Sequence, residues 1–186
     1  YQDELGEIML PQPNLIGDHQ IYNISTSIAA VRKIFDISDD NIKNSMKKMR
    51  LKGRLEEIKS GKLKSLIGEN RLIIDGGHNI NSAISISKWV KQQNEKVHLI
   101  CGMMNDKPHR EFVNQFENSV KSITLVDIPN QEGSISKEEF KKKLNNKNIH
   151  TAESIEESLL MNNKDDNCIF LCAGSLYLAG EVLNLN

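Results

Sequence analysis

The sequence predicts an α/β fold, with a mostly parallel, Rossmann-like sheet and helices on both of its faces. Four short runs rich in Val, Ile and Leu, at 71–74, 97–101, 123–126 and 168–172, are each bounded by polar or turn residues, as buried strands are. Segments with helical periodicity follow or separate them, at 79–93, 108–117, 136–144, 153–161 and 175–183. Strands that alternate with helices form parallel sheets, and such sheets bind ligands outside the carboxyl ends of their strands.

The first third of the chain has a different pattern. Residues 18–35 and 39–49 are predicted to form two helices, and 54–58 a possible additional strand. We interpret them as an entry layer of the same domain, which we expect to cover 15–186. Residues 1–14, with Pro11 and Pro13 in a connector, are interpreted as a linker and the end of a preceding domain.

Composition narrows the class of protein. A chain of 186 residues is long enough for one domain with a substantial core. Its 24 basic and 25 acidic residues give no electrostatic signature of a nucleic-acid or anionic membrane partner. No apolar stretch approaches the roughly 18 residues that span a bilayer. The three cysteines lie in apolar runs without zinc-ligand spacing, so we expect reduced thiols, no metal site and a cytoplasmic location.

The most site-like segment is Asp75-Gly-Gly-His78-Asn79, where an apolar strand meets a helix. Glycines let a ligand approach the backbone, and the N–H groups at the start of the helix suit an anion such as phosphate. Asp75 could accept a hydrogen bond from a ribose hydroxyl, and His78 could contact phosphate. Alternatively, Asp75 and Asn79 cap the helix and the glycines only turn the chain. On these residues alone both interpretations stay open.

The segment resembles the Asp-(Gly/Val)-(Ala/Gly)-His-Asn-Pro signature of the Mur ligase superfamily, in its folylpolyglutamate synthase and dihydrofolate synthase branch. Four other segments resemble motifs of that branch in the same order. They are the entry helix 15–32 with His19-Gln20 and Asn23, the Gly53-Arg54-Leu55 turn, Cys101-Gly-Met-Met-Asn-Asp-Lys107, and Gly174-Ser175-Leu-Tyr-Leu-Ala-Gly180 near the end. The sequence is therefore identified as resembling the C-terminal domain of that branch.

The resemblance implies a role for individual residues. Asn23 matches an asparagine near the adenine and ribose of ATP, and Arg54 an arginine that reaches the phosphates. Asp75 matches an aspartate that contacts the nucleotide, and His78 a histidine near the phosphoryl and glutamate end. His78 and Arg54 are the candidate catalytic residues. Ser175 either caps the last helix, which we favour, or meets the incoming glutamate.

The resemblance also implies the reaction and its partners. A monomeric, ATP-dependent ligase of folate biosynthesis and one-carbon metabolism would add L-glutamate to dihydropteroate or to a folate, through an acyl phosphate and with magnesium. Its partners would be ATP, L-glutamate, the pterin substrate and its own N-terminal ATPase domain. Two departures from the family pattern, Ile80 after the asparagine and Lys52 before the Gly-Arg turn, leave the candidate ligand atoms in place.

A phosphate-binding Gly-x-x-x-x-Gly-Lys-(Ser/Thr) loop does not occur in these 186 residues. We therefore expect the nucleotide site to be half of a complete one, with the magnesium ligands in the N-terminal ATPase domain. Two other interpretations remain. The chain could belong to another Mur-type amino-acid ligase, although the 174–180 ending favours the folate branch, or it could be a non-catalytic binding module. An ATPase domain encoded upstream in frame would support the enzyme, and a nearby start codon the module.

Overall fold

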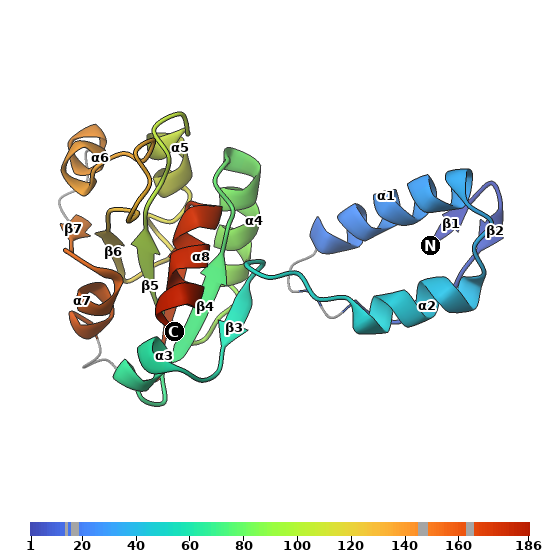
Figure 1. The fold of residues 1–186 in the computed structure, drawn as a ribbon, viewed down its shortest axis with the longest axis horizontal. Coiled ribbons are helices and arrows are strands. Elements are labelled where there is room, and N and C mark those ends of the chain that lie inside the picture. Colours follow the sequence, from blue (N-terminus) through green and yellow to red (C-terminus); the bar gives the residue numbers. More distant parts are fainter. Residues whose placement is uncertain (14, 16–18, 145–148, 163–165) are drawn as a thin grey trace. The chain divides into compact units, whose positions relative to one another are not determined.

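The computed structural model describes residues 1–13, 15, 19–144, 149–162 and 166–186. The described chain forms two compact units, Tyr1–Lys52 and Gly53–Asn186 (Figure 1). This division differs from the expected start of the C-terminal domain at residue 15. The predicted entry layer belongs instead to the first unit, because the apolar faces of its two helices pack on the first ten residues of the chain.

The first unit is built on a small core of its own. Its elements are β1 (Gln2–Asp3), β2 (Gly6–Glu7), α1 (His19–Ile34) and α2 (Asp39–Lys48). Strands β1 and β2 pair antiparallel, and Ser38 caps α2 by accepting a hydrogen bond from the backbone N–H of Asn41 at 3.3 Å. Ile24 and Ile28 on α1 and Ile42 and Met46 on α2 bury their side chains with Ile8. Both predicted helices are confirmed, although residue 18 lies outside the described residues.

The second unit contains a six-stranded sheet in the order β3-β4-β8-β5-β6-β7 (Figure 1). Its strands are β3 (Glu56–Ile58), β4 (Arg71–Asp75), β5 (Lys96–Cys101), β6 (Ser122–Leu125), β7 (Ile149–Thr151) and β8 (Cys168–Ala173). The five neighbouring strands β4, β8, β5, β6 and β7 run parallel to one another. Strand β3 pairs antiparallel with β4 at the edge of the sheet. The predicted α/β fold with a mostly parallel sheet is confirmed.

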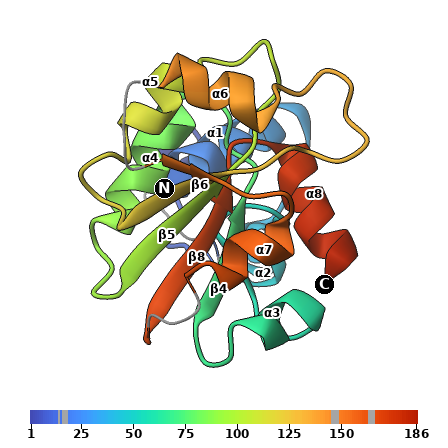
Figure 2. The same cartoon turned by 90° about the vertical axis from the view of Figure 1, so that its left-hand side faces the viewer.

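Helices cover both faces of this sheet (Figure 2). Side chains such as Ile73, Leu99 and Leu171 pack in one core with α4 (Ile80–Val90), α5 (His109–Asn114) and α6 (Lys137–Lys143). Their neighbours along the strands, such as Leu72, Ile100 and Phe170, pack in a second core with α3 (Lys62–Leu66), α7 (Ile155–Leu160) and α8 (Leu176–Leu185). Alternate residues of the central strands β4, β5 and β8 therefore fill opposite cores, which is why these strands read as continuous apolar runs.

The four predicted strands and five predicted helices of this unit are confirmed to within a few residues. The possible strand at 54–58 is present as the shorter β3. Two elements, α3 and β7, have no counterpart in the sequence-based prediction. They comprise five and three residues, which is too short for a period of 3.6 or 2 to stand out from its surroundings.

The three cysteines are buried and form no disulfide bond, and burial raises the pKa of the Cys101 and Cys172 thiols. Cys101 lies in one core, and Cys168 and Cys172 lie in the other. They therefore serve as apolar packing residues. Among the described residues, no helix combines the length and apolar character needed to cross a membrane.

Two loops at the carboxyl edge of the sheet are joined by backbone hydrogen bonds. The N–H of Ile135 donates to the carbonyl oxygen of Met103 at 3.1 Å, and the N–H of Asn105 donates to that of Gly133 at 2.9 Å. The Nε2 atom of the buried His109 lies 3.0 Å from the carbonyl oxygen of Met104, so this nitrogen carries the proton that makes the bond. The loop that follows β5 is therefore fixed from both of its ends.

We predict that acidification destabilises the fold partly through His109. Burial, with the nearby charge of Lys143, lowers the pKa of His109 below its usual value. The unfolded chain therefore binds this proton first, and stability falls as the pH drops below about 6.5. His109→Gln, which keeps a donor for Met104, should flatten the dependence of the free energy of unfolding on pH between 7 and 5.

Urea denaturation of the chain at several pH values measures this slope. His150→Gln, which removes an exposed histidine, is the matched control and should leave the slope as in the wild type. Equal slopes for the wild type and His109→Gln would contradict the assignment.

Candidate functional site

The Asp75-Gly-Gly-His78-Asn79 segment lies between the carboxyl end of β4 and the start of α4, as predicted. Asn79 is the N-cap of α4: its side-chain oxygen accepts from the N–H of Ser82 at 2.9 Å. The Ser82 hydroxyl accepts from the N–H of Asn79 in return, at 3.0 Å, which completes a capping box. The capping interpretation is therefore confirmed for Asn79. Asp75 is used differently.

Both carboxylate oxygens of Asp75 accept backbone hydrogen bonds. Oδ1 accepts from the N–H of Gly77 at 2.6 Å, and Oδ2 accepts from the N–H of Leu55 at 2.9 Å. The residue is only 4% exposed, and an anion buried so deeply needs such donors. A Cβ on Gly77 would lie 2.9 Å from Oδ1, so only glycine fits this turn. Asp75 thus ties the turn before β3 to the turn after β4.

The turn before β3 carries Arg54. The carbonyl oxygen of Gly53 accepts from the N–H of Gly76 at 2.8 Å, and the Gly53 N–H donates to the Glu56 carboxylate at 2.7 Å. Arg54 Nη1 lies 3.9 Å from Asp75 Oδ1, within ion-pair range but beyond a hydrogen bond. The Arg54 side chain is 37% exposed, so its charge remains accessible from solvent.

His78 is half-buried and is oriented by the same turn. Its Nδ1 atom lies 2.9 Å from the carbonyl oxygen of Gly76. Because a carbonyl oxygen only accepts, Nδ1 carries the hydrogen, and Nε2 becomes the accepting nitrogen of the neutral ring. The ring orientation is therefore set by the backbone of the strand-to-helix turn.

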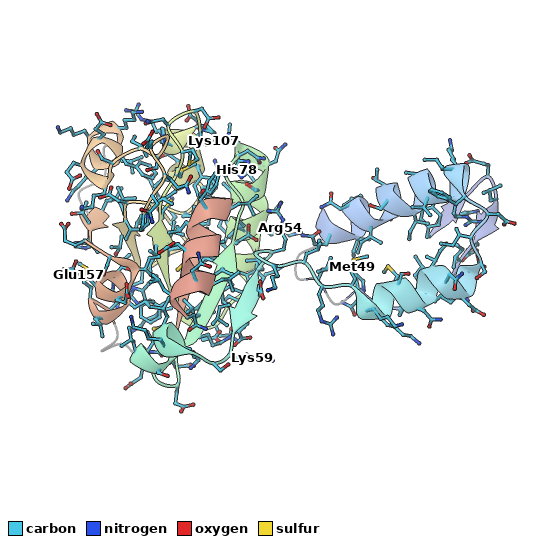
Figure 3. The ribbon with its side chains drawn as sticks, viewed as in Figure 1. Met49, Arg54, Lys59, His78, Lys107 and Glu157 are labelled. Carbon is cyan, nitrogen blue, oxygen red and sulfur yellow. The ribbon has the colours of Figure 1, made fainter. Side chains whose placement is uncertain are left out.

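The loop after β5 approaches His78. A hydrogen bond from Lys107, at 2.6 Å, lowers the pKa of the Asp106 carboxyl, and the nearby His78 lowers it further. Figure 3 shows His78 and Lys107 toward the same end of the sheet, with Lys59 toward the opposite end. Two loops from the carboxyl edge therefore bring charged side chains together near one imidazole.

The backbone N–H groups of the two glycines are already used within the protein. Gly76 donates to Gly53 and Gly77 donates to Asp75, so these two N–H groups are not available to an anion. The carbonyl oxygen of Gly77 accepts from the N–H of Gly174 at 3.1 Å. Ser175 caps α8 by accepting from the N–H of Tyr177 at 3.1 Å, which confirms the favoured role of that serine. The two glycine N–H groups therefore do not serve as anion donors in this turn.

The structure brings together three of the four predicted site residues, Arg54, Asp75 and His78. Asn23 belongs to the other unit, on α1, where its exposed amide nitrogen donates to Gln20 Oε1 at 3.2 Å. Sequence reasoning missed Glu56. The available signal was a carboxylate three residues after a glycine, which is close enough to accept from the backbone of that glycine.

The fold and this site define an α/β domain with a candidate site at the carboxyl edge of its parallel strands. A family model described as "Mur ligase, glutamate ligase domain" matches residues 53–176, which is most of the chain. The chain belongs to this family. The match begins at the glycine of the Arg54 turn and so coincides with the start of the second compact unit.

Named relatives agree with the branch indicated by the motifs. The chain is 27% identical, over 86% of its length and 40% of the relative, to a dihydrofolate synthase/folylpolyglutamate synthase of Haemophilus influenzae. It superposes on a Mycobacterium tuberculosis folylpolyglutamate synthase complexed with ADP and AMPPCP with a TM-score of 0.79 and 18% identity, over 97% of this chain and 42% of that one.

A bifunctional synthase of Yersinia pestis with Mn, AMPPNP and L-glutamate bound gives a TM-score of 0.75 and 19% identity, over 94% of this chain and 40% of that one. These two structures confirm the fold. The chain spans only 20% to 43% of the length of the curated relatives that it matches. The resemblance to the folylpolyglutamate synthase and dihydrofolate synthase branch is confirmed.

We predict that Asp75→Asn destabilises the fold by about 1–3 kcal/mol, the usual cost of an unsatisfied buried group. An amide presents an NH2 group to one of the two backbone donors, Leu55 or Gly77, and so leaves that N–H without an acceptor. Urea denaturation measures the loss. Asp106→Asn, at an exposed carboxylate, is the control and should stay within about 0.5 kcal/mol of the wild type. Equal effects of the two substitutions would argue against a tying role for Asp75.

Proposed function

We propose that this chain is the glutamate-ligase domain of an ATP-dependent folate ligase, which joins L-glutamate to dihydropteroate, to a tetrahydrofolate, or to both. The family match that starts at the Arg54 turn carries the proposal. The relatives support the branch: one is named as a dihydrofolate synthase/folylpolyglutamate synthase, and another binds AMPPNP and L-glutamate.

The proposed reaction has two steps. The pterin carboxylate takes the γ-phosphoryl group of ATP and releases ADP, which gives an acyl phosphate. The amine of L-glutamate then attacks the acyl carbon, phosphate leaves, the nitrogen loses a proton, and an amide forms. This order activates a carboxylate that does not react with an amine by itself.

Arg54 is the residue that we assign to the phosphates. Its charge is permanent, and its planar guanidinium suits the oxygens of a phosphate. Exposure of 37% leaves it accessible, while Asp75 lies close enough at 3.9 Å to orient it without a direct hydrogen bond. In this position the cation stabilises the charge that shifts between phosphoryl oxygens during transfer. We assign Asp75 to the nucleotide side of the same site, where its main effect is to hold the Arg54 turn.

His78 is assigned to the end where the phosphoryl group and L-glutamate meet. Its Nδ1 lies 2.9 Å from the carbonyl oxygen of Gly76 and donates to it, so that Nε2 is the accepting nitrogen whenever the ring is neutral. That nitrogen suits a hydrogen bond from the incoming ammonium or amine, and it can hold the proton that leaves as the amide forms. Asn23 of the first unit is assigned to the adenine and ribose.

The phosphate loop and the magnesium site are assigned to a separate ATP-binding half, and we call the two halves together the complete ligase. The 186 residues contain no phosphate-loop motif. Within the described ranges, no group of three or more His, Cys, Asp and Glu side chains is arranged to hold a metal ion. Closure of the two halves would exclude water from the acyl phosphate.

Substrate choice is tested by assaying the complete ligase with dihydropteroate and with tetrahydrofolate in the presence of ATP and L-glutamate. Amide formation with either substrate supports the folate branch. Activity only with a cell-wall precursor would move the chain to another branch of the same family. Absence of ligation with every acceptor would favour a binding module.

We predict that Arg54→Ala lowers the turnover number of the complete ligase about 100-fold, the scale of losing one charge-stabilising contact. ATP-dependent amide formation measures it. Lys59→Ala, which removes an exposed cation toward the opposite end of the sheet (Figure 3), should keep wild-type turnover. An unchanged turnover number in Arg54→Ala would remove Arg54 from the phosphate site.

We predict that His78→Ala slows the glutamate-dependent step more than it weakens ATP binding. Within the described residues, the one hydrogen bond of the His78 side chain goes to the carbonyl oxygen of Gly76. Removing the imidazole should therefore leave the turn in place. Single-turnover formation of the acyl phosphate and of the amide, measured beside the Kd for ATP, separates the steps. Equal losses in ATP binding and amide formation would place His78 elsewhere.

A further inference from the structure

We propose that Glu56 is a positioning residue for Arg54: with Asp75 it braces the turn that carries the arginine, and so holds the guanidinium in place for the phosphates. The inference rests on the proposed function for the role of Arg54. The brace itself rests only on the geometry of residues 53–56 and 75.

The turn has an unfavourable backbone. Gly53 has φ of 65° and Leu55 has φ of 44°, so two residues on either side of Arg54 lie in the left-handed region. For a leucine this conformation is strained and persists only when surrounding contacts enforce it. The Leu55 side chain is buried in the core that contains Ile73 and Ala83. Packing therefore fixes one end of the turn.

Two carboxylates fix the backbone on both sides of Arg54. The N–H of Gly53 donates to Glu56 Oε2 at 2.7 Å, and the N–H of Leu55 donates to Asp75 Oδ2 at 2.9 Å. Bonds from an N–H to a charged acceptor are about twice as strong as neutral ones. The Gly53 carbonyl oxygen also accepts from Gly76. The backbone is thus held on both sides of Arg54, by the carboxylates that accept from Gly53 and Leu55 and by the Gly76 N–H that donates to the Gly53 carbonyl oxygen.

Asp75 cannot replace Glu56 in this brace. Its Oδ2 is used by Leu55 and its Oδ1 by Gly77, and its side chain is 6% exposed. The Gly53 end of the turn is partly buried, and Glu56 is the side chain that accepts from its N–H. Because the Arg54 side chain is 37% exposed, neighbouring packing does not fix it, and its position follows the backbone of the turn.

The neighbouring Glu57 shows what an ordinary surface carboxylate does on the same strand. It pairs with Arg71, with 3.2 Å between Oε1 and Nε. Within the described ranges Glu56 makes no ion pair with a side chain, and its carboxylate accepts from the backbone N–H of Gly53. The two adjacent glutamates therefore differ in role, and Glu57 provides a matched control.

The brace is tested first on this chain alone, by amide hydrogen exchange followed by NMR. Glu56→Ala should speed exchange of the Gly53 amide at least tenfold, because the N–H loses its acceptor. Glu56→Gln should restore most of the protection, since its side-chain oxygen can accept the same bond. Glu57→Ala should leave that amide unchanged. Unaltered Gly53 exchange in Glu56→Ala, or no recovery in Glu56→Gln, overturns the brace.

The effect on Arg54 is tested in the complete ligase. Glu56→Ala should lower the turnover number about tenfold, with a smaller change in the KM for the pterin, and Glu56→Gln should recover most of the rate. Glu57→Ala should match the wild type. If Glu56 acts through Arg54, then Arg54→Ala with Glu56→Ala together should be no slower than Arg54→Ala alone, because residues in one unit are not additive.

The outcomes separate the two proposals. If Arg54→Ala is slow and Glu56→Ala is as fast as the wild type, the positioning role fails while the proposed function stands. The positioning role is also overturned if the double variant loses turnover by the product of the two single-variant losses. If Arg54→Ala itself keeps full turnover, the phosphate assignment fails, and with it the functional part of this inference, although the exchange experiment still decides the brace. Should Glu56→Ala not fold, Glu56→Thr, which suits a strand but is too short to repeat the bond to Gly53, replaces it in both experiments, and Gly53 exchange at the wild-type rate then overturns the brace.

Discussion

The buried carboxylate of Asp75 is the constraint on which the rest of the candidate site depends. A charge that is 4% exposed is stable only with compensating donors, and here these are the backbone N–H groups of Leu55 and Gly77, with Arg54 nearby. To supply them, two separate turns must lie against each other. One turn presents Arg54 and the other presents His78. The position of both side chains is therefore a consequence of satisfying one anion.

The direction of β3 makes this meeting of turns possible. Residues that follow parallel strands gather at the carboxyl edge of a sheet, whereas Arg54 precedes a strand. Because β3 runs antiparallel to β4, with Glu56 opposite Ile74, the start of β3 lies beside the end of β4. A turn before β3 thus reaches the same edge as the loops after β4, β5 and β8. One reversed edge strand adds a cation to a site otherwise made from strand-to-helix loops.

The sequence predicts those parts of the fold that its local periodicity encodes. Continuous apolar runs such as 97–101 and 168–172 identified buried parallel strands, and the turn at 75–79 fell at a strand end as expected. The reversed direction of β3 was not predictable, since three residues carry no signal for their pairing partner. The packing of helices α1 and α2 on Ile8 was not predictable either, because a helical period shows that a face is buried but not against which part of the chain. The hydrogen bond from Gly53 to Glu56 depends on the left-handed backbone of Gly53. A glycine in the sequence permits that conformation but does not predict it.

The distribution of hydrogen bonds also explains why side chains, and not the glycine backbone, carry the proposed recognition. A phosphate-binding loop leaves several N–H groups unpaired and convergent on the anion. Here the N–H groups of Gly76 and Gly77 are used by Gly53 and Asp75. Their use makes the turn rigid but removes it as an anion cradle. The charges that remain accessible are side chains on a fixed frame, such as Arg54. A rigid turn with one accessible cation suits a domain that contributes a single charge to phosphates bound mainly by another domain. Such a role requires that Arg54 be placed accurately. The carboxylates of Glu56 and Asp75, which accept from the backbone on either side of Arg54, provide that placement.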